Sequence, residues 1–110
     1  MQMSGFDDRG KSFEAKYKHD QEALFRITSR RNRLLGIWAA GEFGMAEDQT
    51  SAYAKEVVIS DFEEPGDGDV VRKVLSDFAA RGLDMTEQKI RDEMDRLMDV
   101  AAQQIESENS

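Results

Sequence analysis

The chain has 110 residues, contains no cysteine and carries a formal net charge of -8. This length allows one domain, and the lack of cysteine excludes a disulfide framework, a thiolate nucleophile and a cysteine-based zinc site. No apolar run approaches the ~20 residues that cross a bilayer, so we expect neither a signal peptide nor a segment that inserts into the membrane. The absence of cysteine fits a reducing compartment, and we expect a cytoplasmic protein.

The N-terminal segment differs in composition from the rest of the chain. Residues 1–33 hold eight Lys and Arg against five Asp and Glu, and residues 34–110 hold seven against eighteen, so the net charges are +3 and -11. Phe6, Phe13 and Tyr17 recur at a spacing typical of one helix face. Gly10 disfavours that helix by about 1 kcal/mol relative to alanine, and a short isolated helix is marginal in water. We therefore expect residues 1–18 to form a flexible arm that becomes helical on a partner.

Residues 5–12, GFDDRGKS, also match the phosphate-loop pattern G-x-x-x-x-G-K-[ST]. A phosphate loop follows a buried strand, yet only four residues precede Gly5. In addition, Asp7 and Asp8 would repel the phosphate oxygens that such a loop binds. A small protein that binds or hydrolyses a nucleotide through Gly5–Ser12 is therefore the alternative function.

Residues 19–110 predict an all-α fold, a four-helix bundle. Apolar residues recur at helical spacing in four stretches, near residues 20–41, 48–64, 69–81 and 86–104. Helix-ending residues follow the first three stretches: Gly41 and Gly44, then Pro65 with Gly66, then Gly82. The short connections favour an up-down bundle in which neighbouring helices are antiparallel.

Two details of this bundle concern the ends of helices. The second stretch places Phe62 on the same face as Tyr53 and Val57, so Phe62 is expected to be buried. The tail after Gln104 is expected to fray.

Six short blocks occur in this order along almost the whole chain: FDDR (6–9), FEAKY (13–17), HD (19–20), RRNRLLGIWAA (30–40), YAKEVV (53–58) and DFEEPGDGDV (61–70). In these blocks the sequence closely resembles the zeta subunit of α-proteobacterial ATP synthases, and the RRN-x-LLG-x-WAA run is the most specific of them. Two positions depart from the family: it usually has a helix-favouring residue in place of Gly10 and a charged or bulky residue in place of Gly41.

The resemblance implies a four-helix bundle that inhibits ATP hydrolysis by the synthase and is not itself an enzyme. It implies that the N-terminal arm enters a catalytic α/β interface of the head as a helix near the rotor γ subunit, and so blocks rotation in the hydrolytic direction. It also implies that the bundle binds ADP or ATP weakly as a regulatory ligand and requires no cofactor. The protein would then meet the inner membrane only through the synthase.

The residues of the arm are the expected contacts to the synthase: Phe6, Asp7, Asp8, Arg9, Phe13, Lys16 and Tyr17. Without the resemblance, the aromatic residues could equally pack onto the bundle, and the charged ones could be a solvated helix start.

Arg30, Arg31 and Arg33 are the candidate nucleotide-binding residues, because guanidinium groups bind phosphates in bidentate fashion. The alternative is a charged helix face near a core tryptophan, Trp38. A nucleic-acid partner is not expected, because the acidic body would repel a polyanion. No metal site is predicted, since the single histidine, His19, has no cysteine or second histidine beside it. No catalytic group is predicted either, because no Ser-His-Asp set or carboxylate pair has a spacing that singles it out.

Overall fold

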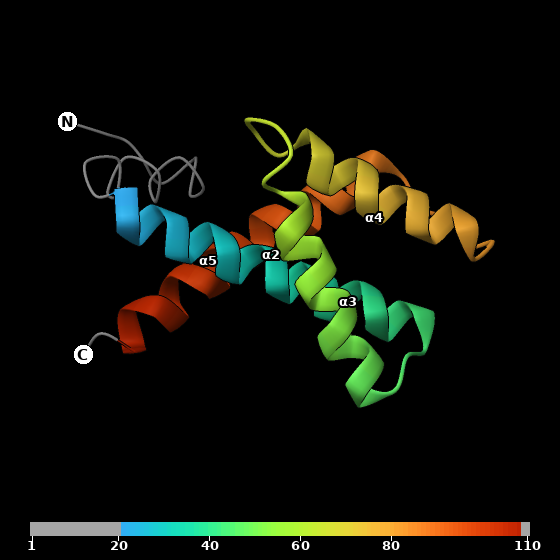
Figure 1. Ribbon diagram of the computed structural model, residues 1–110, viewed down its shortest axis with the longest axis horizontal. Coiled ribbons are helices and arrows are strands. Elements are labelled where there is room, and N and C mark those ends of the chain that lie inside the picture. Colours follow the sequence, from blue (N-terminus) through green and yellow to red (C-terminus); the bar gives the residue numbers. More distant parts are fainter. Residues whose placement is uncertain (1–20, 109–110) are drawn as a thin grey trace.

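The computed structural model describes residues 21–108 of the chain (Figure 1). In this part of the chain there are four helices and no strand: α2 (Gln21–Phe43), α3 (Glu47–Ser60), α4 (Gly68–Ala80) and α5 (Glu87–Glu108). The predicted all-α, four-helix fold is therefore confirmed. The predicted arm, residues 1–18, lies outside the described residues. None of the four helices is both long and apolar enough to cross a membrane.

The arrangement is centred on α2, which packs against each of the other three helices. The two longest helices, α2 and α5, lie together and run in opposite directions, so α5 returns to the end of the molecule where α2 begins (Figure 1). The shorter α3 and α4 pack around the other end of α2 (Figure 1).

The turn between α2 and α3 depends on Gly44 rather than on Gly41. Gly44 has a φ of 76°, in the left-handed region where an L side chain is strained. By contrast, Gly41 lies inside α2. The prediction that both glycines end this helix is therefore right for Gly44 and wrong for Gly41.

The buried apolar side chains form two clusters. The larger lies among all four helices and includes Leu35, Val57, Val74 and Phe78. The smaller lies between α2 and α5 and consists of Ile27, Met98, Ala101, Ala102 and Ile105. Leu34 packs against both clusters.

Trp38 is half-buried and packs against the larger cluster, with its ring centroid 5.7 Å from that of Phe78. Trp38 is therefore part of the packing of the bundle, in agreement with the alternative that it is a core tryptophan near a charged helix face.

The contact between α2 and α3 is closest at Gly36. A Cβ atom at this position would lie 2.6 Å from the backbone Cα of Ala54 and 3.2 Å from a methyl group of Val57. Gly36 thus allows the two helix backbones to approach more closely than any residue with a side chain would permit.

Both predictions about helix ends are wrong. Helix α3 ends at Ser60, and Phe62 is 63% exposed because the chain has already left the helix when it reaches this residue. Helix α5 continues past Gln104 to Glu108, because Ile105 is buried against α2 and extends the packed part of the helix.

Candidate functional site

A pocket lined by arginines lies at the beginning of α2. Its α2 side consists of two neighbouring rows of residues four positions apart, one with Phe25, Ser29 and Arg33 and the other with Arg26 and Arg30. Val58 of α3 and Ile105 and Glu108 of α5 complete it, and its volume is about 400 Å³. We call it the arginine pocket.

Arg30 holds the end of α5 through three hydrogen bonds. Its Nη1 donates to Oε1 of Gln104 at 2.8 Å and to Oε2 of Glu108 at 2.8 Å, while its Nη2 donates to the other Glu108 oxygen at 3.0 Å. The two bonds to Glu108 form a bidentate pair, which stabilises the carboxylate. They lower the pKa of Glu108 below its ordinary value.

Arg33 and Arg26 are less engaged than Arg30. Arg33 is exposed and forms no ion pair or hydrogen bond with any residue between 21 and 108. Arg26 lies 3.9 Å from Glu22, a long and exposed ion pair that contributes little. The arginine pocket therefore has guanidinium donors that can bind an anionic group from outside.

Arg31 lies in a different place from the two arginines predicted to act with it. It is 8% exposed, and its Nε donates to Oδ1 of Asn32 at 3.0 Å. Asn32 in turn donates from Nδ2 to Oδ2 of Asp61 at 2.9 Å, next to the connection between α3 and α4. Consecutive helix residues point about 100° apart, so Arg31 lines another pocket, with Asp61 and Pro65. The structure thus brings together only two of the three predicted nucleotide-binding residues.

The carboxyl group of Asp61 is held in a partly buried position by this network. Burial raises the pKa of Asp61, while the hydrogen bond from Asn32 and the positive charge of Arg31 oppose the rise. The network therefore supports the end of α3 and is not free to bind a ligand.

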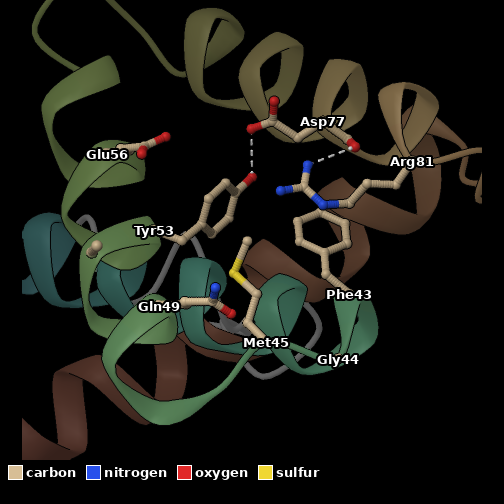
Figure 2. A pocket seen from close by; sticks show the side chains of 9 residues that line it. Phe43, Gly44, Met45, Gln49, Tyr53, Glu56, Asp77 and Arg81 are labelled. Carbon is tan, nitrogen blue, oxygen red and sulfur yellow. Dashed lines mark hydrogen bonds between the residues drawn. The ribbon is translucent and has the colours of Figure 1, made fainter.

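A third pocket, of about 460 Å³, lies between the end of α2, α3 and α4 (Figure 2). The Tyr53 hydroxyl donates to Asp77 at 2.8 Å, and burial together with this bond raises the pKa of Tyr53. The Arg81 guanidinium covers the ring of Phe43 at 4.2 Å and donates to the Asp77 carbonyl at 3.2 Å. Figure 2 shows these side chains turned toward one another. The polar groups are thus paired within the protein, which favours a structural role.

Lys73 adds to the pairing around this third pocket. Its Nζ lies 2.8 Å from Glu56 and 2.9 Å from Asp77, so Asp77 binds both Tyr53 and Lys73.

Within residues 21–108, no three His, Cys, Asp or Glu side chains are grouped so that they could hold a metal ion.

Sequence reasoning missed an exposed pair of aromatic rings. Phe25 of α2 is 56% exposed and stacks on Phe62, with ring centroids 6.2 Å apart and planes 17° from parallel. The spacing of Phe62 predicts a core residue, and nothing in the sequence pairs it with Phe25. The predicted arm contacts, from Phe6 to Tyr17, lie outside the described residues.

Comparison with known proteins gives two findings. A family model described as "ATPase inhibitor subunit zeta" matches residues 3–104. A solved structure titled "Solution NMR structure of the protein" is similar with 43% sequence identity and a TM-score of 0.68, over 76% of this chain and 95% of that one. Among curated proteins, nothing matches this chain.

Proposed function

The chain belongs to the ATPase inhibitor subunit zeta family, and we propose that it inhibits ATP hydrolysis by the catalytic head of the ATP synthase through its N-terminal arm. In this proposal residues 1–18 enter a catalytic α/β interface as a helix near the rotor γ subunit and block rotation in the hydrolytic direction. The bundle stays outside the interface and holds the arm in place. No bond is made or broken by the protein, which acts by binding.

The observation that carries this proposal is the family match, because it covers the arm and almost all of the bundle. The structure supports the separate roles that the proposal gives to the arm and to the bundle. The four helices of residues 21–108 bury their apolar faces in two shared clusters, so their packing is built from the bundle's own residues. The arm has a separate aromatic stripe, Phe6, Phe13 and Tyr17, at the spacing of a helix that binds in a groove.

The test is the ATPase rate of the synthase head with and without the full chain. The variant Gly10→Ala then distinguishes a helical arm from a phosphate loop. Alanine lowers the cost of forming the bound helix by up to about 1 kcal/mol, so inhibition should become up to about fivefold tighter. If Gly10 instead belongs to a phosphate loop, the same substitution impairs function. Weaker inhibition by Gly10→Ala, or ATP hydrolysis by the isolated chain that Lys11→Ala abolishes, would favour the phosphate-loop alternative.

We further propose that ADP or ATP binds in the arginine pocket as a regulatory ligand. Arg33 offers unpaired donors there, and Arg30 already binds one carboxylate in bidentate fashion, which is the geometry that a phosphate group needs. Arg31 is not part of this proposal, because its side chain lies in the network with Asn32 and Asp61.

The pKa of Glu108 reports on this second proposal. If nucleotide phosphates take the Arg30 guanidinium, Glu108 loses the hydrogen bonds that lower its pKa, and the pKa should rise toward its ordinary value when ADP is added. Titration of the carboxyl carbon by NMR measures this change. Arg30→Gln should produce the same rise without ADP, while Arg26→Gln should not. ADP-dependent shifts confined to α4 and the first half of α5 would contradict this location.

A further inference from the structure

The surface next to the arginine pocket carries an apolar patch that the bundle does not cover. Its centre is the stacked pair Phe25 and Phe62. Ile59, which is 54% exposed, is joined to Phe62 by a backbone hydrogen bond from the Phe62 N–H to the Ile59 carbonyl. We call these three residues the aromatic patch. Large exposed apolar side chains that are grouped together mark interaction sites, and aromatic residues and arginine are enriched at the centres of protein interfaces.

The charge around the aromatic patch indicates the chemistry of what covers it. Phe25 is itself part of the arginine pocket, so Arg26 and Arg33 border the patch along α2. Acidic residues flank Phe62 in the chain, but Asp61 is hydrogen-bonded to Asn32 and Glu64 is paired with Arg72, which leaves Glu63 as the exposed carboxylate on that side. A complementary partner therefore offers an apolar surface bordered by carboxylates.

The position of the aromatic patch indicates which partner this is. Helix α2 begins at Gln21, one turn before Phe25, so the patch lies where the arm joins the bundle. Phe25 lies eight positions after Tyr17, a span of at most about 28 Å when extended and about 12 Å as a helix. Whatever surface binds the arm therefore lies within reach of the patch.

We propose, on the basis of the inhibitory function given above, that the aromatic patch docks on a carboxylate-bordered apolar surface of the synthase head. The arm and the patch then form two linked contacts with the same partner. Binding of the second contact becomes intramolecular once the first is made, so the pair binds more tightly than either alone. The bundle is thus an anchor with its own contact, and not only a support for the arm.

Direct binding to the synthase head tests this docking. Because the chain has no cysteine, Ser110→Cys gives a single site for a fluorophore, and anisotropy then measures the dissociation constant without nucleotide. Phe62→Ser should weaken binding about tenfold to thirtyfold, the range for loss of an aromatic anchor. Arg33→Glu should also weaken it, with an effect that shrinks as salt is raised. Leu83→Ser removes another exposed apolar side chain, between α4 and α5, and should leave binding unchanged.

The variants are expected to remain folded, because Phe62 is mostly exposed and lies beyond the end of α3. Thermal unfolding within a few degrees of the parent chain verifies this. Equal binding by the parent chain and Phe62→Ser would overturn the docking. Tighter binding by Phe62→Ser would also overturn it, because the patch would then hold residues 6–17 of its own chain. A dimer seen by sedimentation that Phe62→Ser dissociates would overturn it as well, because the patch would then bind a second copy of the chain. If the parent chain neither binds nor inhibits the head, the proposed function fails as well.

Discussion

Replacing Gly36 by valine is expected to lower the free energy of unfolding by about 3 kcal/mol or more, the upper part of the usual range for overpacking. The added Cβ would lie 2.6 Å from the Ala54 backbone, so α2 and α3 must separate, and the two further methyl groups crowd Val57. For a domain of this size the loss should lower the midpoint of thermal unfolding by roughly 12 °C or more. Calorimetry or circular dichroism measures it.

Gly41→Ala is the matched control for this prediction. Both glycines lie inside α2, but a Cβ at Gly41 would have no atom within 4 Å. Alanine there should therefore stabilise the protein by up to about 1 kcal/mol through its higher helix propensity. If Gly36→Val and Gly41→Ala unfold at similar temperatures, the close approach of α2 to α3 does not limit the stability of the bundle.

Deleting residues 2–18 is expected to weaken inhibition of the synthase ATPase at least about a hundredfold, while the bundle remains folded. The deletion removes two aromatic anchors, Phe6 and Phe13, each of which should contribute roughly thirtyfold to binding. Folding should persist because the buried clusters of residues 21–108 are shared among the four helices. The ATPase rate of the head against inhibitor concentration gives the first quantity, and helical circular dichroism the second.

A full-length chain with both Phe6→Ala and Phe13→Ala separates loss of the anchors from loss of the arm's backbone. It should inhibit almost as poorly as the deletion. Arg96→Gln, which changes an exposed pair with Glu93 on α5, should inhibit like the parent chain. A deleted chain that still inhibits at the original concentration would place the inhibitory contact in the bundle. A deleted chain that binds the head without inhibiting it is what the aromatic patch predicts.

The four helices could be predicted from the sequence because periodic apolar residues and a few glycines suffice to define them. Their ends could not all be predicted. The spacing of Phe62 continues the pattern of α3, but that pattern has no meaning once the chain turns away at Ser60. The residues after Gln104 are polar apart from Ile105, so only packing against α2 and the bonds to Arg30 show that α5 continues.

The candidate site was predictable only in part for a related reason. Three arginines within four residues suggest one cluster, but a helix separates neighbouring residues by about 100°, so Arg31 leaves the face that Arg30 and Arg33 share. Which face is buried depends on the partner helices, and the sequence does not reveal that. The stacking of Phe25 on Phe62 joins residues 37 positions apart, so no local pattern predicts it.

The hydrogen bonds that link Arg31, Asn32 and Asp61 restrict which substitutions these three positions can tolerate. Asn32 has no exposed surface, and its two polar atoms bind the other two residues. A nonpolar residue in place of Asp61 leaves the buried Asn32 amide without this acceptor. One in place of Asn32 removes the acceptor of the Arg31 Nε. An unpaired buried polar group costs about 1–3 kcal/mol. Joint replacement of all three by apolar residues avoids that loss. In related proteins, these three positions should therefore covary.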